Sequence, residues 1–230
     1  MSPRGAKSSS RSPHAAAAES SPPPRRTQRQ RSSQAERALL DAATSLFALR
    51  GVDQTSLAQI GEHAGYSRGL VNHHFGTKDV LVDQLARRTQ TDFVAALDDV
   101  DGDAIDVLVK LADTYLSTIE RGAATSRAFF VMWGAAIPAE ATLRPVFATD
   151  DARFRLGVEA VLRAGQDSKT VIAELDPILG AVILVGMLRG VGAQYLIDPD
   201  AFDMSAARQA CEQFVRRAFA APRKRLRTKE

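Results

Sequence analysis

A short polar segment in the first third of the chain carries side chains suited to nucleic-acid contacts. Arg68 and Asn72 are residue types that pair with guanine and adenine in the major groove, and Ser67 and His73 can reach phosphates or bases. Gly69 removes bulk where a helix must approach the duplex closely. These side chains act together only if one exposed face of a helix presents them, so the segment predicts a DNA-reading helix.

Two short helices joined by a tight turn would present this face. Thr55 or Ser56 is placed to cap the first helix, because its hydroxyl can accept a hydrogen bond from an unpaired backbone N–H. Gly65 suits the left-handed residue that ends a helix. Ser67 can then cap a second helix over residues 68–74. This arrangement predicts a helix-turn-helix unit, whereas an ordinary helical hairpin with a solvated polar face is the plainer alternative.

A third helix is expected to begin directly after this unit. Thr77 can cap it, and its free N–H groups and partial positive charge would attract a phosphate. Lys78 adds a full positive charge at the same place. The residues that we expect to contact DNA are Thr55, Ser56, Ser67, Arg68, Gly69, Asn72, His73 and Lys78.

The stretch from Gln54 to Leu81 resembles the DNA-binding signature of the TetR family of one-component transcriptional regulators. The resemblance covers closely about the first third of the folded part, and beyond it only a helical architecture matches. The chain departs from the family at Asn72, where a phosphate-contacting Tyr is usual, so Asn72 contacts a base edge or nothing. The residues that carry the resemblance are Ala64, Gly65, Ser67, Gly69, His74, Phe75, Lys78 and Leu81.

Composition and charge agree with an all-α chain that binds a polyanion. The chain has 230 residues, 45% of them hydrophobic, and no segment alternates as a strand would. Residues 1–33 and 216–230 each carry a net charge of +6 within a total of +3, so the tails would add salt-sensitive, sequence-independent affinity for phosphates. The single cysteine excludes an intramolecular disulfide and fits a cytoplasmic protein.

Capping residues and apolar spacing predict the remaining helices. Ser33 and Glu36 form a capping box that would open the first helix. The last helix has an apolar stripe that places Cys211, Phe214 and Phe219 inward. The expected helices beyond the helix-turn-helix pair cover residues 33–50, 77–97, 103–121, 125–137, 150–164, 177–197 and 205–220. The predicted fold is an N-terminal three-helix DNA-binding domain joined by a long helix to a C-terminal helical ligand-binding and dimerisation domain.

Four segments follow from these boundaries. Residues 1–33 are expected to be a disordered basic tail, because they hold almost no large apolar side chain. Residues 34–92 form the DNA-binding domain, residues 93–221 the effector-binding and dimerisation domain, and residues 222–230 a second basic tail.

The predicted helix over residues 177–197 is apolar on most sides but is interrupted by Arg189, which argues against a membrane span. Small residues at helical spacing let another helix approach closely, which favours a seam shared between two subunits over pure core. The family resemblance implies the same, because TetR members dimerise through a four-helix bundle of their last two helices. The interface residues that we expect are Gly186, Gly190, Ala193 and Phe214.

A group of aromatic residues is the candidate effector site. Plain core packing explains each of them equally well, whereas the resemblance implies a pocket whose ligand releases DNA. Arg189 needs a partner inside its apolar helix, either a carboxylate across the dimer or, less favoured, an acidic effector. The candidate effector residues are Tyr115, Phe129, Phe130, Trp133, Phe147 and Arg189.

Catalytic and metal sites find little support. His63, His73 and His74 lie near one another in sequence, but their faces point in different directions, so no metal or other cofactor is expected. Gly190 to Gly192 lacks the third glycine and the preceding strand of a dinucleotide loop.

The sequence therefore predicts a ligand-responsive transcriptional regulator, a repressor rather than an enzyme. It would bind a near-palindromic operator in double-stranded DNA as a homodimer and be released by a small-molecule effector. The alternative is a helical interaction or small-molecule carrier module that does not bind specific DNA.

Overall fold

The computed structural model describes residues 27–94, 102–138 and 141–222. In these ranges helices are joined by loops, and strand pairing is limited to an isolated bridge between Val171 and Ala220. The all-α prediction is confirmed for this part of the chain. Its helices are α1 (Gln28–Arg50), α2 (Leu57–His63), α3 (Arg68–Phe75), α4 (Lys78–Val94), α5 (Ala104–Arg121), α6 (Ala123–Ala135), α7 (Arg144–Asp167), α8 (Pro177–Ile197) and α9 (Met204–Phe219).

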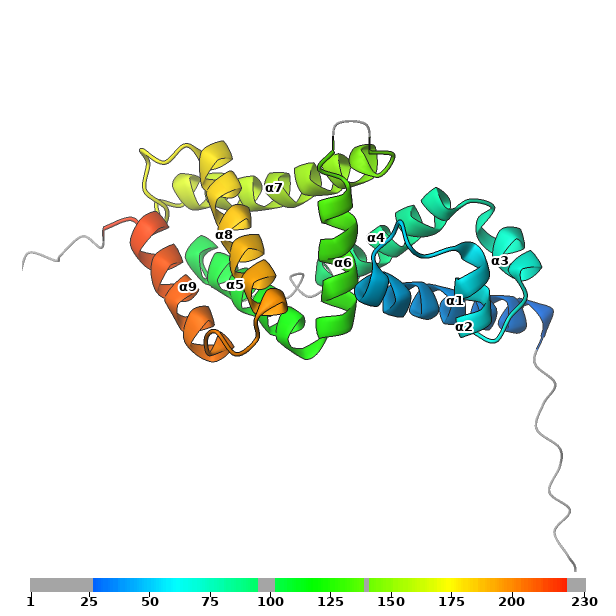
Figure 1. Ribbon diagram of the computed structural model, residues 1–230. Coiled ribbons are helices and arrows are strands. Elements are labelled where there is room, and N and C mark those ends of the chain that lie inside the picture. The colour runs from blue at the N-terminus through cyan, green and yellow to red at the C-terminus, as the bar shows by residue number, and fades with distance from the viewer. Residues whose placement is uncertain (1–26, 95–101, 139–140, 223–230) are drawn as a thin grey trace, which may run out of the picture.

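The helices form two lobes, and α6 stands between them (Figure 1). Helices α1 to α4 make one lobe, and α5, α7, α8 and α9 make most of the other, where α9 packs along α5 and α8 along α7. Helix α6 packs along α1. Its residues Phe129 and Met132, together with Phe147 of α7, are buried in the same hydrophobic cluster as the core of α1 to α4. The two lobes therefore share part of one core.

The first helix begins earlier than its predicted cap. Thr27 is the N-cap, because its hydroxyl accepts from the backbone N–H of Gln30 and the Gln30 side chain accepts from the Thr27 N–H. The expectation that Ser33 opens this helix is therefore wrong. Polar residues with good helix propensity continue a helix as well as apolar ones do, so the start of the apolar stripe does not mark the start of the helix.

Helix α7 also exceeds its prediction at both ends. It begins at Arg144 rather than near Asp150, because Pro145 lies in the first turn, where a missing N–H costs no hydrogen bond. It continues past residue 164, where it was predicted to end, through Gly165 to Asp167. The predicted contribution of Leu97 to α4 falls outside the described residues.

The last two helices match their predictions closely. Asp176 caps α8, and its carboxylate accepts from the backbone N–H groups of Ile178 and Leu179. Helix α9 differs from its predicted bounds by one residue at each end. Phe214 was expected to point inward within the chain, but it is 42% exposed, and Val215 takes the buried position instead.

Gly165 permits close packing of the second lobe and supplies a stability test. A Cβ at this position would collide with the Val171 side chain and lie 2.7 Å from the Cβ of Ala104. We expect Gly165→Ala to lower the free energy of unfolding by ~1–3 kcal/mol through overpacking, measured by urea denaturation. Gly157→Ala in the same helix meets nothing within 4 Å and should instead stabilise by ~0.5–1 kcal/mol. Equal effects of the two changes would contradict this explanation.

Candidate DNA-binding surface and effector site

Helix α3 presents the polar face that the sequence predicts. The Ser67 hydroxyl accepts from the backbone N–H of Leu70 at 3.3 Å, which confirms it as the cap. Val71 and Phe75 are buried in the core of the lobe. The opposite face leaves exposed Ser67, Arg68, Gly69, Asn72 and His73.

The close approach of α2 to the start of α3 depends on a glycine that the sequence analysis did not single out. A Cβ on Gly61 would lie 2.9 Å from Cγ2 of Val71 and 3.0 Å from the Tyr66 carbonyl oxygen. Gly65 adopts a φ of +75° in the turn, as predicted. A glycine on the inner face of a short helix, directly before a turn, is the feature that could have indicated this contact.

The two residues proposed to begin α2 have different roles. Ser56 is the cap, and it forms a capping box with Gln59 on the exposed surface. Thr55 is only 1% exposed, and its hydroxyl donates to the Gly51 carbonyl oxygen at 2.8 Å. The prediction that Thr55 presents its side chain to DNA is therefore wrong, because the hydroxyl closes the loop between α1 and α2.

Lys78 connects α4 to that same loop. Its Nζ donates to the carbonyl oxygens of Val52 at 2.9 Å and Thr55 at 3.3 Å, so two of its three N–H donors are engaged within the lobe. Thr77 caps α4 as predicted, since its hydroxyl accepts from the Val80 N–H at 3.3 Å. The ammonium therefore fixes the position of the α1–α2 loop relative to the N-terminus of α4, and the contact of Lys78 with a phosphate stays a prediction.

In the other lobe a buried arginine joins three helices. Arg189 of α8 is 7% exposed, and its Nη2 donates to Oδ1 of Asp151 on α7 at 2.5 Å. The Trp133 indole of α6 donates to Oδ2 of Asp151 at 3.1 Å. The expectation that Arg189 needs a carboxylate across a dimer is wrong, because its partner lies in its own chain. Asp151 was missed because nothing in its local sequence indicates the distant Arg189.

The guanidinium of Arg189 also lies over two aromatic rings. Its central carbon is 4.9 Å from the centre of the Trp133 ring and 5.4 Å from that of Phe129. Attraction between a cation and the face of an aromatic ring partly offsets the cost of removing this charge from water. Arg189 therefore fills an aromatic cage made by two side chains of α6.

Two donors of Arg189 nevertheless find no partner. Nε and Nη1 are buried, and no acceptor lies within hydrogen-bonding distance of them in the described part of the chain. A buried donor without an acceptor costs on the order of 1–3 kcal/mol, and native proteins hold few of them. Such a group is a candidate functional site, because a ligand can supply the missing acceptor.

Aromatic side chains surround this arginine. The rings of Phe129 and Phe130 meet edge to face with their centres 5.7 Å apart, and the ring centre of Phe147 lies 5.8 Å from that of Phe129. Tyr115 stacks on Phe154 at 5.9 Å, and burial raises the pKa of Tyr115 to about 12, so its hydroxyl stays protonated at neutral pH. The structure thus brings the predicted effector residues into one region.

The predicted dimer residues lie on an apolar surface that the described chain leaves uncovered. A Cβ added to Gly186 or Gly190 would meet nothing within 4 Å, and Ala193 is partly buried. Helix α8 is long and apolar enough to cross a membrane, but its other side, with Leu184 and Leu188, lies in the core of the lobe. The large apolar side chains exposed on α8 and α9 are Ile178, Leu179, Val182, Ile183, Ile197 and Phe214.

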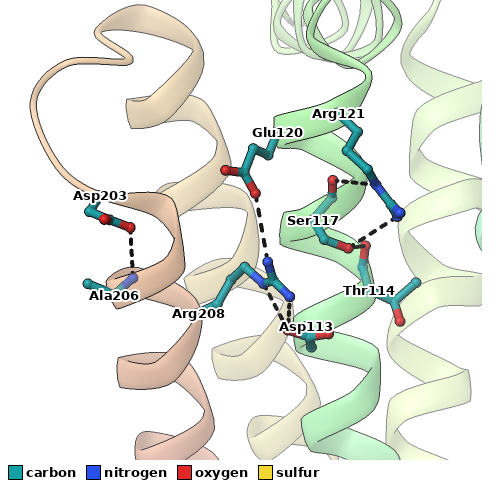
Figure 2. Close-up of polar contacts among 8 residues, drawn as sticks. All are labelled: Asp113, Thr114, Ser117, Glu120, Arg121, Asp203, Ala206 and Arg208. Atoms are coloured by element: carbon teal, nitrogen blue, oxygen red, sulfur yellow. Dashed lines mark hydrogen bonds and ion pairs between the residues drawn. The ribbon is translucent and has the colours of Figure 1, made fainter.

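A polar groove lies between α5 and α9, and Arg208 of α9 pairs with two acidic residues of α5 there (Figure 2). Arg208 donates from Nη2 to Asp113 at 2.5 Å and lies 3.7 Å from Glu120, so its contacts fasten α9 to α5. Arg121 donates to the carbonyl and hydroxyl oxygens of Ser117 within α5. Among the described residues no group of three or more His, Cys, Asp or Glu side chains is arranged to hold a metal ion.

Two protein-family models match the chain. Residues 39–85 match the N-terminal domain of "Bacterial regulatory proteins, tetR family", and residues 104–220 match the "BetI-type transcriptional repressor, C-terminal" model. The first match covers the helix-turn-helix unit. The second covers about half of the chain, including the helices that hold the Arg189 site.

Individual proteins show the same similarity. An HTH-type transcriptional repressor of Mycobacterium tuberculosis, Rv3405c, is 53% identical over 45 residues, which are 20% of this chain and 24% of that protein, so the match spans about a quarter of the relative. The SmeT–triclosan complex is similar in fold, with a TM-score of 0.71, 22% identity and coverage of 85% of this chain and 96% of that one. A putative regulator of Saccharomonospora viridis in complex with choline has a TM-score of 0.71 and 22% identity, covering 83% and 100%.

The position of Lys78 gives a direct test within the DNA-binding lobe. We expect Lys78→Met to lower the free energy of unfolding by ~1–3 kcal/mol, because two carbonyl oxygens in the α1–α2 loop lose their donor. Thermal or urea denaturation measures this change. Lys110→Met, an exposed lysine on α5, serves as the matched control and should have almost no effect. A Lys78 variant as stable as the control would show that its ammonium does not hold the loop.

Proposed function

We propose that this chain, which belongs to the TetR family of bacterial regulatory proteins, represses transcription in the cytoplasm as a homodimer that a small-molecule effector releases from its operator. The chain is a transcriptional regulator by family. The observation that best supports the proposal is the exposed face of α3, which is capped at Ser67 and braced from behind by α2 at a glycine contact.

The α3 face divides into base-reading and backbone-binding groups. Arg68 and Asn72 project from the exposed side of the helix, and their side chains suit the donor and acceptor patterns of guanine and adenine. Ser67, His73 and the N-terminus of α4 suit phosphate oxygens. Lys78 contributes by holding the α1–α2 loop, with one donor left for a phosphate.

The exposed apolar face of α8 and α9 supports a twofold dimer. Gly186 and Gly190 leave the backbone of α8 open to a partner helix, and Ile183 of α8 and Phe214 of α9 supply exposed apolar area. Large apolar side chains gathered on the surface of a protein usually mark an interface. A twofold dimer would place two copies of α3 one duplex turn apart, about 34–36 Å, on a near-palindromic operator.

Helix α6 offers a short path from the effector site to DNA. Trp133 and Phe129 touch Arg189 from α6, and the same helix packs along α1 in the DNA-binding lobe. Helix α4 also packs against α6 and α7, so an effector that displaces α6 moves both α1 and α4. A small rotation of each α3 misaligns it with its half-site, and a loss of ~3 kcal/mol lowers operator occupancy about 100-fold.

The structural neighbours also support a small-molecule effector, since one is a complex with triclosan and another with choline. The rival function, a carrier module that does not bind specific DNA, would need the same C-terminal lobe but no use for the α3 face. Residues 1–26 and 223–230, which were predicted to strengthen non-specific DNA binding, lie outside the described residues.

Arg68 tests the DNA-reading role. We expect Arg68→Ala to reduce the ratio of operator to scrambled-duplex affinity by roughly 5- to 150-fold, since a paired contact to guanine contributes ~1–3 kcal/mol of discrimination. Fluorescence anisotropy with an operator selected from random duplexes measures this ratio. Arg163→Ala, which removes an exposed arginine of α7 paired with Glu159, is the control and should leave the ratio unchanged. Equal loss for both duplexes after Arg68→Ala would assign Arg68 to the phosphates.

Ile183 tests the dimer. It is 52% exposed on α8, so Ile183→Asp should leave the subunit folded while placing two charges in a desolvated seam. Sedimentation velocity should show a monomer at micromolar concentration. Leu156→Asp replaces a similarly exposed leucine of α7, 61% exposed, and should remain dimeric. A dimeric Ile183 variant would exclude this face as the interface.

A further inference from the structure

We propose that the effector is a neutral, largely apolar molecule whose oxygen atom accepts a hydrogen bond from Arg189. This inference rests on the proposed function, because it assigns a chemical class to the effector of that regulator. The evidence lies in which donors of Arg189 are occupied and in what surrounds them.

The buried N–H groups of Arg189 that lack a hydrogen-bond partner need an acceptor. Nη2 is bonded to Asp151, whereas Nε and Nη1 are buried without an acceptor in the part of the chain that the structure describes. The side chain is only 8% exposed, and a guanidinium keeps its proton at any physiological pH. These N–H groups therefore remain donors, and a ligand with a carbonyl, ether or hydroxyl oxygen would satisfy one of them.

A cationic effector is disfavoured by the same geometry. Aromatic faces are the surfaces that bind quaternary ammonium groups, but those of Trp133 and Phe129 already face the Arg189 guanidinium at 4.9 and 5.4 Å. A second cation would have to displace Arg189 from both rings, or lie beside it against charge repulsion. The cage is thus filled by the protein's own cation.

An anionic effector is disfavoured by Asp151. Its carboxylate already neutralises Arg189 and also accepts from the Trp133 indole. A further negative charge would lose its hydration and meet this carboxylate. The aromatic rings of Phe129 and Phe130 favour an apolar body for the ligand.

Trp133 is the only tryptophan of the chain, so its fluorescence reports on this site alone. We would titrate the full-length protein with three probes that share an eight-carbon chain: 2-octanone, octanoate and octyltrimethylammonium. The neutral ketone should bind at least 10-fold more tightly than either ion. This ranking is measured on the unsubstituted protein, so it requires no variant to fold.

Arg189→Met then tests the role of the donors, because methionine is unbranched and roughly similar in length but carries none of the side-chain N–H groups of arginine. We expect it to weaken 2-octanone binding at least 10-fold, whereas Arg208→Met in the polar groove of α5 and α9 should leave binding unchanged. Tighter binding of either ion, no binding of the ketone, or equal ketone affinity in the folded Arg189 variant would overturn the proposal.

Operator selection by the unliganded protein is a separate measurement. Its failure refutes the proposed function, whereas its success together with a failed ranking of the three probes refutes only the effector class.

Discussion

The packing of α6 against α1 is the constraint on which the rest of this structure depends. Phe129 and Met132 of α6 are buried with Leu39 and Phe47 of α1, so the DNA-binding lobe does not complete its core alone. A closely packed interior changes between discrete arrangements rather than deforming smoothly. Any shift of α6 therefore reaches α1 and α4 through direct contact, and these two helices pack against α2 and α3.

The Arg189 site lies on the other side of the same helix. Asp151 accepts from Arg189 and from Trp133, which joins α6, α7 and α8 through one carboxylate. An ion pair of this kind is an expensive way to stabilise a fold, because an apolar set of similar volume often does as well. Its position at the proposed effector site suits a role in switching, because Phe129 belongs both to the cage around Arg189 and to the core shared with the DNA-binding lobe.

Local signals in the sequence predicted the local features well. Ser56 and Ser67 cap helices as expected, because a cap and the N–H groups that it accepts from lie within three residues of each other. The exposed face of α3 followed from the same reasoning. The start of α1 was missed because the apolar stripe begins later than the helix, whose true cap is Thr27.

The features that the sequence could not predict are contacts between distant residues. Lys78 bonds to carbonyl groups 26 and 23 residues earlier in the chain, and Arg189 to a carboxylate 38 residues away. No spacing rule relates such partners, because the tertiary packing alone brings them together. Thr55 was misassigned for the same reason: its polar character suggested the surface, whereas its hydroxyl closes a buried loop.

Coupling between two sites is reciprocal, so operator DNA must perturb the effector site if α6 connects them. The most direct measurement is the emission spectrum of Trp133 in the full-length protein with and without saturating operator duplex, with a scrambled duplex of equal length as reference. The account predicts a shift in wavelength or intensity with the operator that the scrambled duplex does not produce. An unchanged spectrum, while anisotropy shows the operator fully bound, would contradict it.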